Sequence, residues 1–147
     1  MKFHTRTRYG LRTMIEIAAG DKDCGVYQKD IAQNQSISVK YLDQIINSLK
    51  VAGLITNVKG KKSGYQLTRP AAQITMLDIH NAFEFGICVV DCTNKSFHCD
   101  KRGSCAAEDF WGNLNNKIID HFRSVTLEEL AAEQKQINLK HQPEGIS

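Results

Sequence analysis

An amphipathic segment at residues 39–52, followed at once by a basic hairpin, is the feature that most constrains the fold. Its apolar residues repeat with the i, i+3, i+4, i+7 spacing of one buried helix face, at Leu42, Ile45, Ile46 and Leu49. Ser38 is placed to cap this helix and Gly53 to end it. A shorter helix is expected at 28–33, and the polar link NQS joins the two into a helix-turn-helix.

Two short strands are expected after this helix pair. The stretches LITNVKG (54–60) and GYQLTRP (64–70) flank the tip GKKSG and have the composition of a β-hairpin. A helix-turn-helix followed by a basic hairpin is a winged helix. The sequence therefore predicts a mainly α fold with a small β-hairpin wing, in which a further helix at about 7–19 precedes the pair.

The outer face of the predicted winged helix has the chemistry of a DNA-binding surface. Packing occupies the apolar face of 39–52, so donors and acceptors project outward on a rod narrow enough for a major groove. These outward residues are Lys40, Tyr41, Asp43, Gln44 and Asn47. The wing tip offers Lys59, Gly60, Lys61 and Lys62 to phosphates or to a minor groove. Taken alone, this tip also fits an ordinary solvated hairpin.

The charge is divided unevenly along the chain. Residues 1–70 carry 12 Lys and Arg against 5 Asp and Glu, whereas residues 71–147 carry 7 against 11. A basic first half suits a polyanionic partner for that half only. This asymmetry supports DNA binding by the winged helix.

A long helix is expected from about Ala106, after a short helix that Thr75 caps. Its apolar stripe continues over four turns, through Trp111, Leu114, Ile118, Phe122 and Val125. A capping box at 126–129 starts another short helix, and the chain ends in a polar tail. A second copy of the chain is the most economical cover for the stripe, because a two-fold dimer presents two reading heads to a palindromic site. Packing within one monomer is the alternative.

A cysteine loop (residues 86–105) lies between these parts and has no helical periodicity. Cys92, Cys99 and Cys105 are separated by six and five residues, whereas structural zinc sites use C-x2–4-C pairs. The longer gaps suit a loop wrapped around an iron–sulfur cluster, whose charge the basic side chains in the loop could offset. Neither a signal peptide nor a membrane-spanning stretch is evident, so we expect a cytoplasmic chain in which clustered thiols serve metal or redox chemistry.

The chain resembles the Rrf2 family of bacterial winged-helix transcriptional regulators, in particular its IscR- and NsrR-like iron–sulfur members. The resemblance covers RYGLRTM (8–14), SVKYLDQIINSLKVAGLI (38–55), VKGKKSGYQLTRPAAQITMLDI (58–79), the three loop cysteines and VTLEEL (125–130). It implies a homodimer whose cysteine loop holds an iron–sulfur cluster, with cluster status changing DNA affinity. It also implies that residues of one helix enter the major groove, namely Ser38, Lys40, Tyr41, Asp43 and Gln44, while the wing reaches the minor groove near Lys59.

The fourth ligand of such a cluster stays open. IscR-like members have a histidine three residues after the third cysteine, and that position is Glu108 here. Cys105 and Glu108 would lie one helical turn apart, although a glutamate in a first turn is also favoured by the helix dipole. The other candidates are His98, Cys88 and a His4 from a partner subunit.

We therefore expect a DNA-binding regulator, not an enzyme, that senses iron–sulfur, redox or nitric-oxide status through a cluster. The ligands would be Cys92, Cys99, Cys105 and Glu108, and we favour [2Fe–2S] over [4Fe–4S]. Residues 1–80 would bind DNA, 81–135 would hold the cluster and the dimer helix, and 136–147 would be a tail. Two alternatives are a cluster-free regulator that senses thiol oxidation and a small redox enzyme pairing Cys99 with His98.

Overall fold

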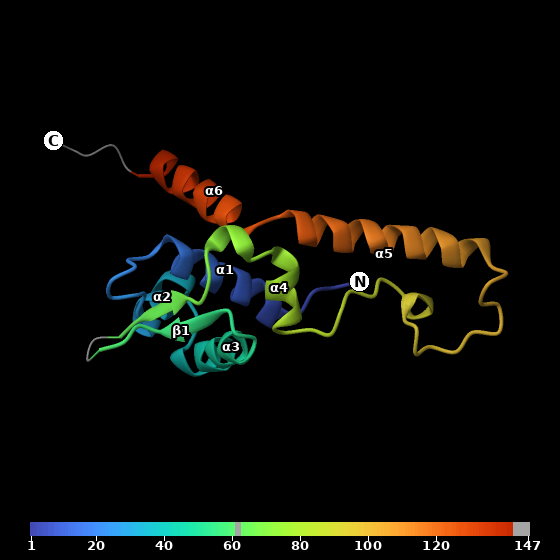
Figure 1. Ribbon diagram of the computed structural model, residues 1–147, viewed down its shortest axis with the longest axis horizontal. Coiled ribbons are helices and arrows are strands. Elements are labelled where there is room, and N and C mark those ends of the chain that lie inside the picture. Colours follow the sequence, from blue (N-terminus) through green and yellow to red (C-terminus); the bar gives the residue numbers. More distant parts are fainter. Residues whose placement is uncertain (61–62, 143–147) are drawn as a thin grey trace.

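The computed structural model describes residues 1–60 and 63–142 and places a winged helix at one end of the molecule (Figure 1). The cysteine loop leads from this body to the far end of the molecule, and a long helix beside it returns to the body. The helices are α1 (Thr5–Ala19), α2 (Gln28–Gln35), α3 (Val39–Val51), α4 (Met76–Asn81), α5 (Ala106–Ser124) and α6 (Leu127–Lys140), with short 3-10 turns η1 (Ala71–Gln73) and η2 (Asp91–Thr93). The strands are β1 (Ile55–Asn57) and β2 (Tyr65–Leu67).

The predicted helix-turn-helix is confirmed. The apolar face of α3 is buried in one cluster with side chains of α1 and α2, including Met14 and Ile31. The Ser38 hydroxyl accepts a hydrogen bond from the Tyr41 amide at 3.1 Å, as expected of a cap. Helix α2 continues two residues beyond the predicted end, because only Ser36, at φ 53°, adopts the left-handed conformation that stops it.

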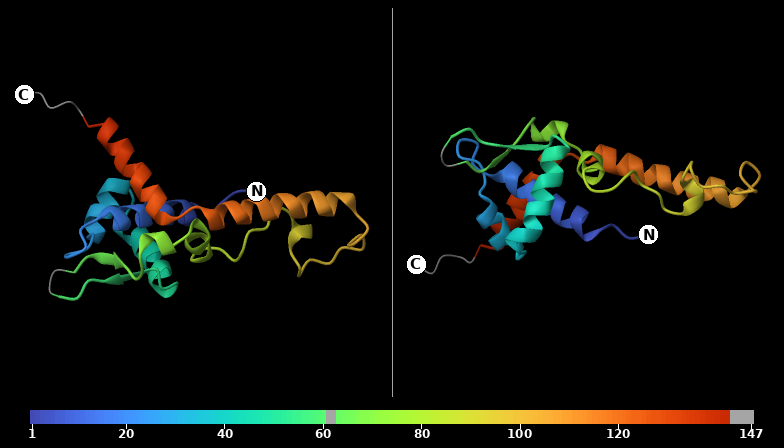
Figure 2. Two further views of the ribbon diagram at one scale, coloured as in Figure 1. Left: turned by 45° about the horizontal axis from the view of Figure 1, so that its top comes forward. Right: turned by 90° about the horizontal axis from the view of Figure 1, so that it is seen from below.

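The wing is a two-stranded antiparallel hairpin, as predicted, in which Ile55 lies opposite Leu67. The tip-side end of β2 is joined to the turn before α2, since Val26 and Tyr65 exchange backbone hydrogen bonds of 3.0 and 2.8 Å. The backbones approach so closely that a Cβ on Gly64 would lie 2.6 Å from the carbonyl carbon of Gly25. Figure 2 shows the hairpin and α5 projecting from opposite ends of the body.

Helix α6 returns to the body and lies against α1. Capping boxes start both α4, at Thr75, and α6, at Thr126, as the sequence predicts. The two caps lie side by side, and the Leu127 amide donates to the Ile74 carbonyl at 2.8 Å. Helix α6 is longer than the expected short helix, because residues 127–140 contain neither glycine nor proline to end it.

Helix α5 begins at Ala106, as predicted, but contacts the body only near its C-terminal end. There Phe122 packs against Phe3 and the buried ring of His80. Farther out, Phe110 is 60% exposed and Leu114 is 37% exposed. The apolar stripe is therefore left open along its outer turns. None of the helices in the described residues is long and apolar enough to cross a membrane.

Replacing Leu49 by alanine should lower the free energy of unfolding by about 2–5 kcal/mol, because its side chain is fully buried in the core. Val51, two residues later on α3, is 81% exposed, and its alanine variant is the matched control. That control should stay within about 0.5 kcal/mol of the parent protein in urea denaturation. Equal losses in the two variants would contradict the assigned orientation of α3.

Candidate functional site

The solvent face of α3 carries most of the polar side chains expected there. Lys40, Asp43, Gln44 and Asn47 are all exposed. Tyr41 differs from the prediction, because its ring is half-buried and meets the ring of Tyr9 on α1 edge to face at 6.0 Å. An aromatic ring beside apolar surface gains more by covering it than by standing in water. One side of the Tyr41 ring therefore covers α1, and the contact of Tyr41 with DNA stays a prediction.

A chain of hydrogen bonds connects the wing to α3 through α2. The Tyr65 hydroxyl donates to Gln28 Oε1 at 3.2 Å, and Gln28 Nε2 donates to the Asp43 carboxylate. Burial, and secondarily the negative charge of Asp43, raise the pKa of the Tyr65 phenol, which keeps it a donor. Lys50 Nζ lies 5.0 Å from the centre of the same ring. Polar contacts thus fix the position of the wing relative to α3. The sequence analysis did not predict these contacts.

The exposed side of the wing carries Lys59 and Gly60. Gly60 has a φ of 133° and open space where a Cβ would stand, so a ligand backbone can approach it closely. Lys61 and Lys62, which were also predicted to contact DNA, lie outside the described residues. An exposed polar helix face and a basic hairpin thus flank the same body, as major-groove and phosphate contacts require.

The cysteine loop is fastened to α5 by a buried asparagine. Asn115 is 7% exposed, and its Oδ1 accepts a hydrogen bond from the Val89 amide at 2.9 Å. The sequence signal for this contact is a polar residue on the apolar side of α5, three residues before Ile118 and seven before Phe122. The polar side chain of Asn115 can be buried there because its amide oxygen accepts a hydrogen bond from the loop backbone.

Arg102 organises the middle of the cysteine loop. Its guanidinium donates to three main-chain carbonyls, those of Phe97 at 2.8 Å, Asn94 at 3.1 Å and Cys92 at 3.4 Å. The loop therefore has a fixed cation at its centre, although it contains little regular secondary structure.

The loop thiols are free, and those of Cys92, Cys99 and Cys105 are half-buried. Cys92 and Glu108 line one pocket of about 460 Å³. Cys105 is the residue that precedes α5, and Glu108 follows it by one turn. The Glu108 carboxylate accepts a hydrogen bond from the Gly103 amide at 2.8 Å, so it also closes the loop.

The other candidate ligands have different partners. His98 is exposed and lies 3.0 Å from Asp100, while the exposed Cys88 thiol donates to the Val90 carbonyl at 3.0 Å. His4 lies 3.5 Å from the Glu84 carboxylate, away from the three thiols in sequence. Of these three, only Cys88 belongs to the segment that Asn115 fastens to α5.

The donors suit an iron–sulfur cluster in their chemistry, because three free thiols share one loop that is fastened to α5 at both ends. Across residues 1–60 and 63–142, however, no three His, Cys, Asp or Glu side chains lie close enough together to bind one metal ion. The structure thus brings Cys92 and Glu108 to one pocket, whereas binding a cluster would require the three thiols to move together.

Comparison with known proteins gives a consistent result over almost the whole chain. The family model named Rrf2, described as an iron-dependent transcriptional regulator, matches residues 3–133. The protein rrf2 of Nitratidesulfovibrio vulgaris is 37% identical over 130 residues, which cover 88% of this chain and 87% of that protein.

Two solved structures share the fold. CymR, the global cysteine regulator of B. subtilis, superposes with a TM-score of 0.78 at 31% identity, covering 90% of this chain and 98% of that one. The IscR of T. potens superposes with a TM-score of 0.74 at 27% identity, covering 99% of this chain and 91% of that one. The winged helix and the long C-terminal helices are therefore shared with transcriptional regulators.

The Asp43→Asn substitution should lower the pKa of Tyr65, because it removes the negative charge that disfavours the phenolate. The pKa should stay above its ordinary value, since burial is the larger cause and is unchanged. NMR titration of the tyrosine Cζ resonances measures this shift. Asp30→Asn, an exposed change on α2, is the control and should leave the Tyr65 titration unchanged. An unaltered Tyr65 pKa in Asp43→Asn would contradict the described contact chain.

Proposed function

The chain belongs to the Rrf2 family of transcriptional regulators, and from this premise we propose that it is a homodimer that senses iron–sulfur, redox or nitric-oxide status. The observation that carries the proposal is the set of three free thiols on a loop fastened to α5, namely Cys92, Cys99 and Cys105. Glu108 is proposed as the fourth ligand, because it shares a pocket with Cys92. We favour a [2Fe–2S] cluster.

DNA contact is assigned to two neighbouring surfaces. The exposed Lys40, Asp43 and Gln44 on α3 offer donors and acceptors to base edges in a major groove. The α3 N-terminus, capped by Ser38, would lie toward the phosphates, where backbone amides favour anions. Lys59 and Gly60 on the wing would contact the backbone or the minor groove.

The exposed stripe on α5 supports the proposed dimer. On the turns of α5 far from the body, Phe110 is 60% exposed and Leu114 is 37% exposed, although the cysteine loop covers the neighbouring Asn115. A second α5 related by a two-fold axis would bury the same side chains of both copies, since such an interface is self-complementary. The two winged helices would then read a palindromic operator.

When bound, the cluster would supply redox or nitric-oxide reactivity to the loop. The chain's own contribution is to place its ligands beside the dimer helix. Cys105 directly precedes α5, and the segment just before Cys92 is tied to Asn115. Gain or loss of the cluster would therefore move α5 and change the relative placement of the two winged helices in the dimer.

Lys59→Ala should weaken binding to every duplex by a similar factor and reduce the slope of log affinity against log salt by about 1. The reason is the loss of one phosphate contact from the wing. Fluorescence anisotropy at several salt concentrations measures both quantities. Lys117→Ala, an exposed change on α5, is the matched control. If the two variants bind alike, the wing does not contact DNA.

Single Cys92→Ser, Cys99→Ser and Cys105→Ser variants should lose iron and inorganic sulfide after anaerobic reconstitution, whereas the parent protein holds both in similar amounts. Cys24→Ser, which changes a half-buried thiol outside the loop, should keep them. Glu108→Ala should alter the visible spectrum, while His98→Ala should not. A parent protein that stays colourless and free of sulfide would overturn the cluster.

A second candidate is a cluster-free regulator that responds to thiol oxidation. It is favoured because no three candidate ligands lie together within residues 1–60 and 63–142, and by the likeness to CymR, the Staphylococcus aureus form of which is known in an oxidized state. The loop cysteines would then form disulfides under oxidant. Mass spectrometry that finds such disulfides in protein that never takes up sulfide would decide for this function.

A further inference from the structure

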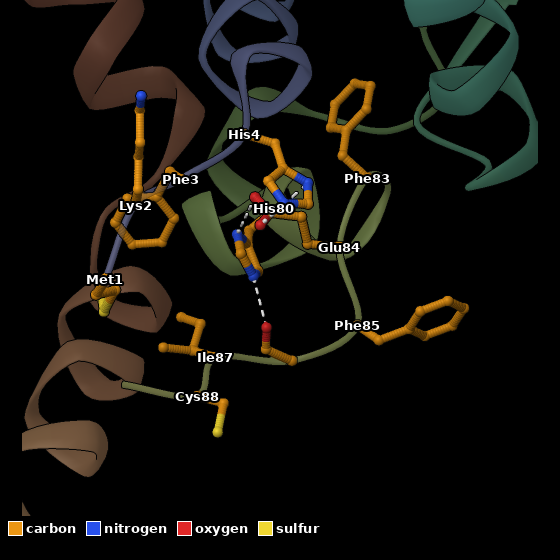
Figure 3. A pocket seen from close by; sticks show the side chains of 11 residues that line it. Met1, Lys2, Phe3, His4, His80, Phe83, Glu84, Phe85, Ile87 and Cys88 are labelled. Atoms are coloured by element: carbon orange, nitrogen blue, oxygen red, sulfur yellow. Dashed lines mark hydrogen bonds and ion pairs between the residues drawn. The ribbon is translucent and has the colours of Figure 1, made fainter. Parts of the chain in front are cut away.

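His80 lies where several segments of the chain meet (Figure 3). Its side chain is nearly fully buried, with the residue 1% exposed. The ring meets Phe3 of the N-terminal segment at 5.7 Å between centroids and Phe122 of α5 at 5.6 Å, both nearly edge to face. A polar ring enclosed in this way has a high cost of desolvation, so its two nitrogens require partners.

One nitrogen of His80 binds the start of the cysteine loop. Nε2 lies 2.8 Å from the Gly86 carbonyl oxygen. A carbonyl only accepts, so Nε2 carries the hydrogen and donates it. The neighbouring Ile87 is buried, and Val89, two residues further, is bound to Asn115. The first residues of the loop are thus held at two successive points.

The other nitrogen faces a carboxylate that is bound to α1. Nδ1 of His80 has no hydrogen-bond partner and lies 3.6 Å from Glu84 Oε2. The same Glu84 carboxylate accepts a hydrogen bond from the hydroxyl of Thr7, a buried residue of α1. His80 and Glu84 together therefore connect the cysteine loop to α1.

The turn that contains Glu84 also fits closely against α1. A Cβ on Gly10 would lie 2.2 Å from the ring of Phe83, so only glycine admits this contact. From α1 the contacts continue to α3, because Tyr9 meets Tyr41 edge to face. A continuous series of contacts thus runs from the cysteine loop to the helix proposed to read DNA.

We propose that His80 is a positioning residue that, through Glu84 and Thr7, couples the state of the cysteine loop to the orientation of α1 and α3. This inference rests on the proposed sensing function and deepens it. A loop that shifts when its thiols change partners must either carry His80 with it or leave buried polar groups unpaired. Because unpaired buried polar groups cost free energy, His80 moves with the loop, and α1 moves with His80 through Glu84 and Thr7.

The first part of the test uses the cluster-free dimer without DNA. His80→Phe keeps a ring between Phe3 and Phe122 but removes both nitrogens, and His80→Gln restores a donor for Gly86. Hydrogen–deuterium exchange should be faster in His80→Phe at the Val89 amide and at those of residues 8–10 together, with partial recovery in His80→Gln. His121→Phe, an exposed change on α5, is the control.

The second part measures the ratio of DNA affinities between anaerobically reconstituted and cluster-free protein. We expect a ratio of about tenfold in the parent protein and less than about threefold in His80→Phe. Thr7→Val, which removes only the hydroxyl that binds Glu84, should lower the ratio in the same way. This second variant keeps the test valid if His80→Phe folds poorly.

The outcomes separate this inference from the proposed function. If exchange rises in the loop but not in α1, or if both variants keep the parent ratio, His80 only anchors the loop and the coupling is wrong. If the parent protein takes up no cluster, the proposed sensing mode fails, and the exchange experiment alone decides whether His80 joins the loop to α1.

Discussion

The apolar face of α3 packs into one cluster with Met14 of α1 and Ile31 of α2, and most of the molecule depends on that packing. Because those side chains are removed from water, the opposite face of the helix is the one left to carry polar groups. The same cluster includes Leu54 and Ile55 at the start of the wing, so the hairpin is placed relative to α3 by the core itself. The hydrogen bonds from Tyr65 through Gln28 to Asp43 then fix the remaining freedom between wing and helix.

Features set by neighbours in the sequence were predicted well. The caps at Ser38, Thr75 and Thr126 each depend on a side-chain oxygen that accepts a hydrogen bond from the amide three residues later, and all three are present. The wing followed from two short strands around a glycine-rich tip. Such signals are local, so they can be recognised in a single sequence without knowledge of the tertiary fold.

Contacts between distant residues could not be found in this way. Gln28 and Tyr65 are separated by 37 positions, Val89 and Asn115 by 26, and Thr7 and Glu84 by 77. The contact that half-buries Tyr41 was not foreseen for the same reason, since it depends on Tyr9 of another helix. For the cysteine loop, the iron–sulfur cluster indicated by the spacing stays a prediction, and the course of the loop depends on contacts made by Asn115, Arg102 and Glu108.

The central claim is that the loop thiols control how the winged helices bind DNA. The most direct measurement compares the affinity for a duplex selected by the parent protein, before and after anaerobic reconstitution, with that of a variant in which Cys92, Cys99 and Cys105 are serine. The account predicts an affinity change of at least about fivefold in the parent protein and none in the variant. A variant that keeps the full change, or a parent protein with equal affinity in both states, would contradict it.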